Sequence, residues 1–462
     1  MTRDMTTGSP IRRILAFCAP LIVGNLFQQF YSIADSVLVG RILGVNSFAA
    51  VGSTAALNFL VLGFALGICS GFAIPIAQSF GAGDGDEVRR RAGQIVWLGV
   101  IFSALITLLA FFWTDDILRI TRTPAEIFGE AYRYIYIVFL GAGATILYNL
   151  SSGVLRALGD SRTPLFFLIA AAVGNIGLDV LFMRTLGMGV EGAAYATVLS
   201  QALSGVACLV YIHARVPMLR LANDDLRPDP RRMRRIATIG VPMGLQFSIT
   251  AIGTIMIQSA VNGLGTAAVA AVAAAAKVHM LITVPLDSVG ATMATYCGQN
   301  LGAKDLGRIR RGVRDITIVS FAFCAAAFLF NYYLGSAVAS LFLDHADPAI
   351  LADVHRYLTV NGAAYPLLAI VFIYRNSLQG MGFSNQAMSA GLAELAARAL
   401  VAFGLVSSFG FSAVCIANGA AWVFADALLL TLYFIETRAL ARRWEKQPYP
   451  REAAVAVHLN HA

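Results

Sequence analysis

Four side chains that carry oxygen stand inside apolar runs of this sequence: Asp35, Asn175, Asp179 and Thr197. A carboxylate within an apolar helix is costly, so its presence predicts a functional site. Asn175 and Asp179 are four residues apart and therefore share one face of a helix, and Ala193 and Thr197 have the same spacing. Two carboxylates, an amide, a hydroxyl and a backbone carbonyl near Ala193 would form a hard oxygen site for a small cation such as Na⁺. Without sodium, neighbouring carboxylates would hold a proton instead.

The depth of these residues within their helices supports one shared site. A rise of about 1.5 Å per residue, counted from the expected helix ends, places Asp35 and Asp179 about 8 Å deep. The same count places Thr197 about 10 Å deep. The alternative is that Asn175, Asp179 and Thr197 only join helices by hydrogen bonds. Structural contacts of that kind seldom need two acids, so we favour the cation site.

The elements that must position these residues are transmembrane helices. The chain has 462 residues, of which 58% are apolar and 13% charged, and its mean hydropathy is +0.71. A soluble protein carries about twice that share of charge, and runs of about 20 apolar residues are long enough to span a bilayer. We therefore predict an all-α membrane protein with about twelve transmembrane helices. They are expected near 14–39, 50–80, 88–113, 130–157, 163–183, 190–214, 234–262, 266–300, 309–342, 351–380, 385–408 and 412–440.

The net charge of +8 comes from arginines placed between the apolar runs, which fits membrane topology rather than nucleic-acid binding. In an alternating topology these arginines all fall on one side of the membrane. By the positive-inside rule that side is cytoplasmic, and so are both termini. The arginines that fix the orientation are Arg12, Arg13, Arg89, Arg90, Arg91, Arg156, Arg162, Arg227, Arg231, Arg232, Arg234, Arg235, Arg308, Arg310, Arg311, Arg438, Arg442 and Arg443.

The sequence also repeats itself after about 220 residues, a period that indicates a duplicated bundle rather than a solenoid. IRRILAFCAP (11–20) aligns with RRIATIGVP (234–242), and AQSFGAGDGDEVRR (77–90) with GQNLGAKDLGRIRR (298–311). Six helices per half make the halves parallel repeats that enclose a central cavity. We predict a first bundle over 1–215, a cytoplasmic linker over 216–233, a second bundle over 234–445 and a cytoplasmic tail over 446–462.

The two halves do not share the acidic site. Asn175 aligns with Arg398, and Asp35 aligns with Ile257. The second half has other charges inside its apolar runs, among which Glu394 and Arg398 have the spacing of a structural ion pair. No catalytic motif, nucleotide-binding loop or zinc-type spacing is visible, and we expect no cofactor beyond a coupling ion.

A substrate cavity is expected between the bundles. Aromatic, methionine and amide side chains suit lipophilic cations through cation–π contact and adaptable packing, although ordinary packing between helices is the alternative for each of them. The candidates are Gln28, Gln29, Tyr31, Phe59, Tyr148, Asn149, Met280 and Tyr296.

As a set, these features resemble the multidrug and toxic compound extrusion (MATE) transporters over residues 11–440. The resemblance is carried by Pro20, Asn25, Gln29 and Asp35 in the first helix, by the QSFGAGD and GQNLGAKD turns, and by LRALGDSRTP (155–164). The sequence is most similar to the bacterial DinF- and MepA-like branch.

The resemblance implies two bundles arranged as a V and export of organic cations in exchange for sodium or protons. It assigns a cation site to Asp35, Asn175, Asp179 and Thr197, with backbone from Ala193. It also implies a bend of the first helix at Pro20 and adds Tyr134 to the residues expected to line the substrate cavity. We therefore expect a monomeric, multi-pass protein of the bacterial inner membrane that acts as a drug antiporter. A lipid-linked precursor flippase of the same superfamily and a membrane-embedded enzyme are the alternatives.

Overall fold

The computed structural model describes residues 4–120, 123–343 and 347–446, and the regular elements in this part of the chain are helical. Ten helices are long and apolar enough to cross a membrane. Two further spans are helix pairs that bend by 44° and 48° at a short break, which gives up to twelve spans among the described residues.

The first half of the chain forms α1 (Pro10–Leu43), α2 (Val45–Ser53), α3 (Ala55–Gly81), α4 (Gly85–Ile120), α5 (Ala125–Leu140), α6 (Ala142–Ala157), α7 (Arg162–Asp179), the π-helical turn η1 (Val180–Thr185) and α8 (Val190–Arg215). A short 3₁₀ turn, η2 (Pro217–Leu219), follows. The second half forms α9 (Pro230–Asn262), α10 (Thr266–Gly302), α11 (Leu306–Phe330), η3 (Asn331–Gly335), α12 (Ser336–Ser340), α13 (Pro348–Ala363), α14 (Tyr365–Gly380), α15 (Ser384–Leu400), η4 (Val401–Leu405), α16 (Val406–Phe409) and α17 (Phe411–Lys446).

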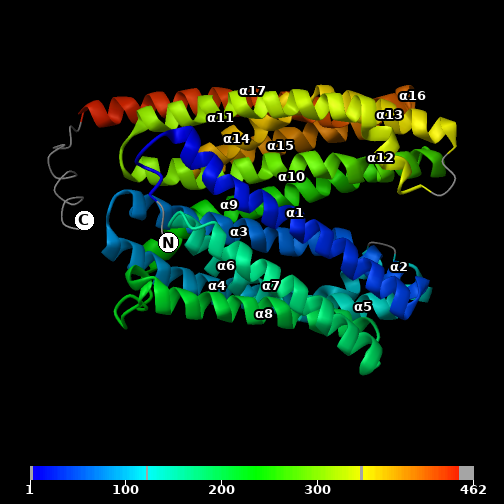
Figure 1. Ribbon diagram of the computed structural model, residues 1–462, viewed down its shortest axis with the longest axis horizontal. Helices are drawn as coiled ribbons and strands as arrows, with labels where there is room; N and C mark the ends of the chain where they lie inside the picture. The colour runs from blue at the N-terminus through cyan, green and yellow to red at the C-terminus, as the bar shows by residue number, and fades with distance from the viewer. Residues whose placement is uncertain (1–3, 121–122, 344–346, 447–462) are drawn as a thin grey trace.

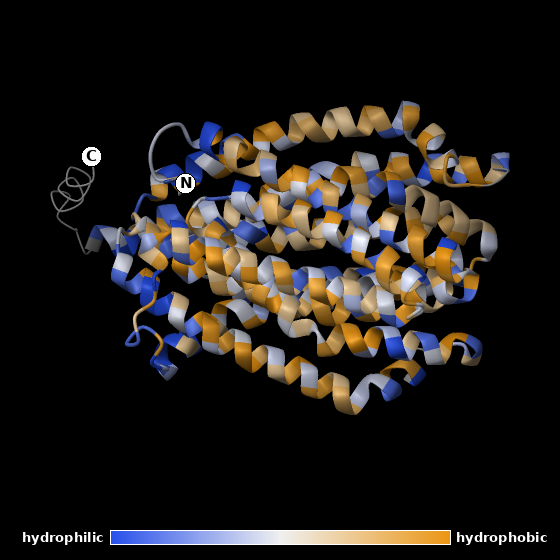
Figure 2. Cartoon of the chain, turned by 60° about the horizontal axis from the view of Figure 1, so that its bottom comes forward, coloured by the Kyte–Doolittle hydropathy of each residue, from blue (hydrophilic) through white to orange (hydrophobic). Residues whose placement is uncertain are grey.

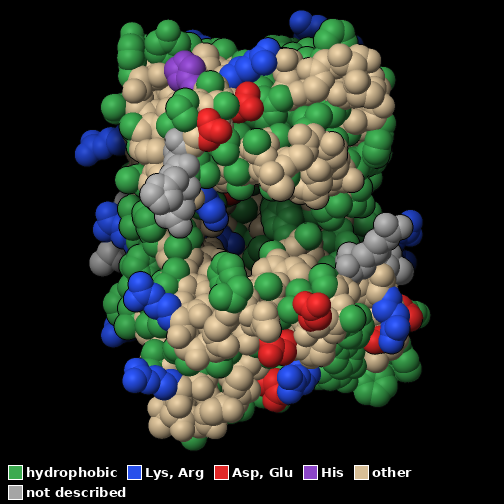
Figure 3. Space-filling model, turned by 90° about the vertical axis from the view of Figure 1, so that its right-hand side faces the viewer, with side chains coloured by type: hydrophobic (Ala, Val, Ile, Leu, Met, Phe, Trp, Pro, Cys, Tyr) green, Lys and Arg blue, Asp and Glu red, His purple; other side chains and the backbone are tan. Residues whose placement is uncertain are grey.

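These helices are arranged as two bundles, one from each half of the chain (Figure 1). The two bundles meet through α1 and α3 of the first and α9 and α10 of the second. At this interface α3 packs on α9, and α1 packs on α10. At the end formed by α2, α5 and α12, the surface is hollowed between the bundles (Figure 3). The fold class predicted from the sequence is therefore confirmed, including the twofold bundle and the cleft between its halves.

Hydrophilic residues gather at the opposite end of the molecule (Figure 2). This is the end at which α1, α4, α9 and α11 begin and α17 finishes, and we call it the terminal end. The predicted arginine segments at the starts of α9 and α11 lie there, while hydrophobic residues predominate along the long middle stretch of the helices.

Several predicted boundaries differ from the structure. The run expected at 50–80 is divided into α2 and α3, and α2 is set off from α1 by Gly44, whose φ of 92° suits glycine. The linker expected to reach 233 is shorter, because Asp229 caps α9 and Pro230 occupies its first position. Residues 447–462 of the predicted tail lie outside the described residues.

Toward the terminal end the bundles approach through glycines that leave no room for a side chain. A methyl group added at Gly81 would overlap the carbonyl oxygen of Gln299, and one added at Gly302 would overlap that of Gln78. Gly71 likewise lies directly against Gly240. Close backbone approach at these points brings α3 against α9 and α10, so the cleft is closed at this end.

Two glutamines join the bundles across this closed end. Gln78 Nε2 donates a hydrogen bond to Gly380 O at 3.0 Å, and Gln299 Nε2 donates to Ala157 O at 2.8 Å. In the sequence repeat Gln78 aligns with Gln299, and Ala157 aligns with Gly380. The duplication has therefore produced two equivalent contacts that face in opposite directions across the interface.

We expect Gly81→Ala and Gly302→Ala to destabilise the closed end, because each added methyl group meets backbone that has to shift. Overpacking of this kind costs about 1–3 kcal/mol, and a lower thermal unfolding midpoint of the purified protein would report it. Gly85→Ala is the matched control, since no atom lies within 4 Å of the position its Cβ would take. Equal midpoints for Gly81→Ala and Gly85→Ala would contradict the packing described here.

Candidate cation site in the first bundle

The predicted cation residues come together from α1, α7 and α8. Asp35 lies on α1, while Asn175 and Asp179 occupy the last two turns of α7 and are buried. Thr197 lies one turn after the buried Ala193 on α8. Each of these helix segments belongs to the half of the first bundle nearer the open end of the cleft.

A π-helical turn, η1, begins immediately after Asp179 and packs against the start of α8. A Cβ at Gly192 would meet the backbone of Phe182 and Met183 at 3.0–3.1 Å, so glycine permits this close contact. Single π-helical turns occur frequently at functional sites, because the wider turn redirects the neighbouring side chains. The turn holds Asp179 at the junction between α7 and α8.

The carboxyl groups of Asp35 and Asp179 are close enough to interact with each other. Among the described residues, Asp35 Oδ1, both carboxyl oxygens of Asp179 and the side-chain nitrogen of Asn175 are buried without a hydrogen-bond partner. A buried polar atom without a partner is uncommon and calls for an explanation, such as an ion or water at the site. The acceptors that lack partners here are the atoms that would coordinate a cation or carry a proton.

Two tyrosines complete the cluster. Tyr31 donates a hydrogen bond to Asn175 Oδ1 at 2.8 Å and also reaches Thr197. Tyr134, on α5, is buried close to both Asp35 and Asp179. Both tyrosines are predicted from the sequence to line the substrate cavity, and the structure places them beside Asp35 and Asp179.

The electrostatics of this arrangement favour occupancy by a positive charge. Two carboxylates in a low-dielectric setting repel strongly, so the pair is stable only when a cation or a proton neutralises one charge. Asn175 Oδ1 keeps a second lone pair after accepting from Tyr31, and Thr197 adds a hydroxyl. The donors gathered here are carboxylate, amide and hydroxyl oxygens, which suit Na⁺ or H⁺ better than a transition metal.

The other predicted residues take varied positions. Phe59 and Gln28 are exposed, and Gln29 and Met280 are half-buried. Pro20 lies within α1 without ending it.

Three residues predicted for the cavity make hydrogen bonds within the bundles. Tyr296 is fully buried and donates to Arg308 O at 2.8 Å, so it has no surface to offer a ligand in this conformation. Tyr148 is nearly buried and donates to Pro164 O. Asn149 donates to Thr145 O of its own helix.

The second bundle contains a buried charge network that the sequence revealed only in part. Glu394 accepts from Arg375 and from Arg398 at 2.7 Å each, so the expected Glu394–Arg398 pair has a second arginine. Both carboxyl oxygens of Asp426, on α17, are buried without a hydrogen-bond partner in the described part of the chain. An acid inside the apolar run at 412–440 was the available signal for Asp426.

Two helical bundles with a cleft between them and a buried acidic site in one bundle define a multi-pass membrane transport protein. The MatE family model matches residues 20–181 and 242–404, one segment in each half, and the chain belongs to this family. Curated relatives are named as multidrug resistance proteins and not as enzymes, and the expected MATE membership is confirmed.

The comparisons with individual proteins agree. The chain is 28% identical over 83% of its length to the probable multidrug resistance protein YpnP of Bacillus subtilis, of which it covers 86%. It is 25% identical over 94% of its length to the probable multidrug resistance protein NorM of Thermotoga maritima, of which it covers 93%. A solved structure described as the outward-facing conformation of a multidrug resistance MATE family transporter has the same fold, with a TM-score of 0.86 and 22% identity over 95% of this chain and 98% of that one.

We expect Tyr31→Phe to destabilise the cation site. Removal of the hydroxyl deprives the buried Asn175 of its partner, which costs about 1–3 kcal/mol, and a lower thermal unfolding midpoint would show it. Tyr195→Phe on α8 is the matched control, because Tyr195 is 44% exposed. A midpoint for Tyr31→Phe equal to that of Tyr195→Phe would show that the hydrogen bond to Asn175 contributes no stability.

Proposed function

We propose that this protein is a secondary antiporter that exports lipophilic organic cations, including drugs, in exchange for Na⁺ or H⁺. The observation that carries the proposal is the Asp35–Asp179 pair, in which Asp35 Oδ1 and both carboxyl oxygens of Asp179 are buried without a hydrogen-bond partner among the described residues. Membership of a multidrug transporter family supports the substrate class. The names of the relatives, YpnP and NorM among them, describe multidrug resistance proteins.

The orientation follows from charge. The terminal end carries the arginine segments, and by the positive-inside rule it faces the cytoplasm. The cleft then opens to the outside, and the bacterial relatives favour the inner membrane as the location. The chain acts as a monomer in this proposal, because the cleft and the acid pair are both formed within it.

The coupling mechanism follows from the charge of the site. A cation that enters from the open side neutralises the acid pair, and its loss leaves two charges that repel. Binding shifts a conformational equilibrium only through different affinities for the two states. A change in the shape of α1, with Pro20 as the bend, would alter the position of Asp35 relative to Asp179 and so supply that difference. Rocking of the bundles then exposes the cleft alternately to each side.

The flippase alternative receives less support. Flippases of the superfamily tend to have two additional helices and a strongly basic cavity, whereas the described residues form up to twelve spans. The substrate groups of the proposed exporter remain Gln28, Gln29, Phe59 and Met280, which keep accessible surface.

Transport in proteoliposomes tests the proposal. With an imposed Na⁺ or H⁺ gradient, the parent should move a fluorescent lipophilic cation such as ethidium, and Asp35→Asn and Asp179→Asn should each fall below about a tenth of the parent rate. Loss of either carboxylate removes the charge change that couples the ion to the conformational equilibrium.

Asp116→Asn is the matched control, because it also removes one carboxylate but at an exposed position. It should transport like the parent. Parent-like transport by both Asp35→Asn and Asp179→Asn would show that the coupling site lies elsewhere. Comparison of the transport rates under a Na⁺ gradient and under an H⁺ gradient would identify the coupling ion.

A further inference from the structure

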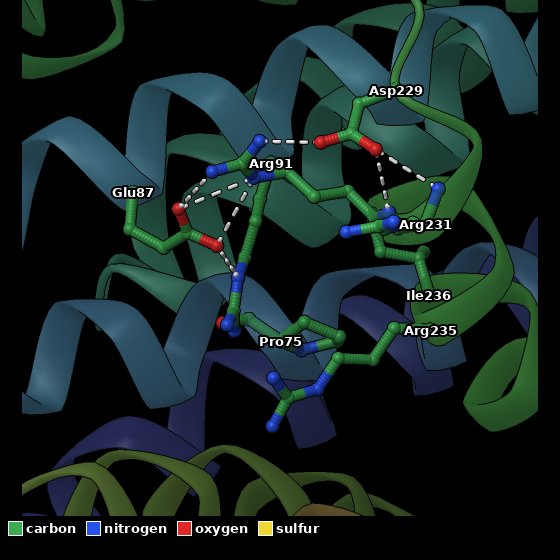
Figure 4. Close-up of a pocket in the computed structure, with 8 residues that line it drawn as sticks. Pro75, Glu87, Arg91, Asp229, Arg231, Arg235 and Ile236 are labelled. Atoms are coloured by element: carbon green, nitrogen blue, oxygen red, sulfur yellow. Dashed lines mark hydrogen bonds and ion pairs between the residues drawn. The ribbon is translucent and has the colours of Figure 1, made fainter.

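A separate pocket of about 290 Å³ opens at the terminal end, between α3, α4 and the first turns of α9 (Figure 4). Its charged lining consists of four arginines and two acids: Arg91, Arg231, Arg232, Arg235, Glu87 and Asp229. The pocket lies at the end of the molecule opposite the open cleft, and none of these residues belongs to the acid pair.

Both acids of the pocket already have partners. Glu87 forms ion pairs with Arg91 at 2.9 Å and with Arg232 at 3.3 Å. Asp229 accepts hydrogen bonds from the backbone N–H groups of Arg231 and Arg232, and its carboxylate also pairs with the Arg232 side chain.

The bonds to Asp229 keep it charged. The backbone N–H of Arg232, followed by that of Arg231, and then the Arg232 side chain lower the pKa of Asp229 below its ordinary value. Asp229 is therefore ionised at neutral pH, and its carboxylate caps the N-terminus of α9.

Two arginines remain without an acidic partner among the described residues. The side chains of Arg231 and Arg235 are exposed, and Arg235 extends across the pocket beside Pro75. Four guanidinium groups against two carboxylates leave the pocket with two positive charges in excess. Arg91 is fixed on the opposite wall, since its Nη1 donates to Pro75 O at 2.6 Å.

We propose that this pocket binds a phosphate-bearing anion through Arg231 and Arg235. Guanidinium groups match phosphate oxygens with paired, charge-assisted hydrogen bonds, and they remain charged at any physiological pH. Arg235 is five residues inside α9, a depth of about 8 Å, which in a bilayer corresponds to the layer of lipid headgroups. The phosphate therefore comes either from an acidic phospholipid in the cytoplasmic leaflet or from a free phosphate compound.

The pocket has walls from both bundles, which gives the ligand an effect on conformation. Glu87 and Arg91 lie on α4 in the first bundle, while Arg231, Arg232 and Arg235 lie on α9 in the second. The Arg232–Glu87 ion pair already joins these walls. An anion bound between these walls would favour the conformation in which the terminal end is closed to the extent that it binds that conformation more tightly.

Binding of inorganic phosphate to the purified full-length protein tests the proposal. The thermal unfolding midpoint is measured in detergent across a phosphate titration, with chloride added to keep the ionic strength constant. The parent midpoint should rise with saturation, and the double variant Arg231→Gln/Arg235→Gln should need at least about tenfold more phosphate, since two charge-assisted hydrogen-bonding groups are lost.

Arg234→Gln is the matched control, because Arg234 is an exposed arginine on the same turn that does not line the pocket. It should behave like the parent. The single variants Arg231→Gln and Arg235→Gln separate lost binding from misfolding. A variant whose midpoint without phosphate equals that of the parent is correctly folded, so a weaker response of that variant to phosphate reports lost binding.

A second measurement distinguishes the two sources of phosphate. The same variants are reconstituted in phosphatidylglycerol or in phosphatidylcholine nanodiscs, and the midpoints are compared. Stabilisation by phosphatidylglycerol that requires Arg231 and Arg235 identifies a lipid headgroup, and stabilisation by inorganic phosphate alone identifies a free compound.

The proposal is overturned if neither source stabilises the parent, or if Arg234→Gln loses as much as the double variant. Because Asp35 and Asp179 lie outside this pocket, failure of the transport test leaves the phosphate measurement unaffected, and the reverse also holds.

Discussion

The constraint on which this structure depends is the cost of a charge in a low-dielectric interior. Such a charge must be neutralised by a partner, by an ion or by a proton, because water cannot stabilise it there. In the second bundle Glu394 meets Arg375 and Arg398, so that charge network is largely neutralised from within. In the first bundle, by contrast, no salt bridge to Asp35 or Asp179 is formed by the described residues, and three of their carboxyl oxygens are buried without a hydrogen-bond partner there. In the proposed function, a mobile cation or proton neutralises this pair.

The two bundles have the same helical architecture but different charged residues at equivalent positions. The repeat aligns Asn175 with Arg398 and Glu87 with Arg308, so acidic or neutral positions in one half are basic in the other. Arg308 binds the carbonyl oxygens of Met5 and Gly8, whereas Glu87 binds Arg232 at the start of α9. Each half therefore holds the start of the other half's first long helix, α1 or α9, and the two side chains that do so carry opposite charges.

Between the bundles, the contacts are suited to being made and broken. Glycines at 81 and 302 bring the backbones together, and Gln78 and Gln299 each add one hydrogen bond across the interface. A neutral hydrogen bond contributes only about 1 kcal/mol because water can replace it on opening. The acid pair and the arginine pocket lie toward opposite ends of the molecule, and if both proposals hold, an ion bound at either place biases the same equilibrium.

The sequence by itself determined the number of spans, the duplication, the one-sided arginines and the acids at Asp35 and Asp179, because each of these follows from hydropathy and spacing along the chain. The tertiary structure decided which side chains meet. Tyr31 and Tyr134, predicted for the cavity, lie beside the acid pair, and Tyr296 is buried. Arg375 lies beside Glu394. The tertiary structure also showed that Asp229 and Arg232 close one side of a pocket whose other side is α4. These contacts join residues on helices far apart in the chain, and helical periodicity fixes the face of each residue on its own helix but not the helix that this face packs against.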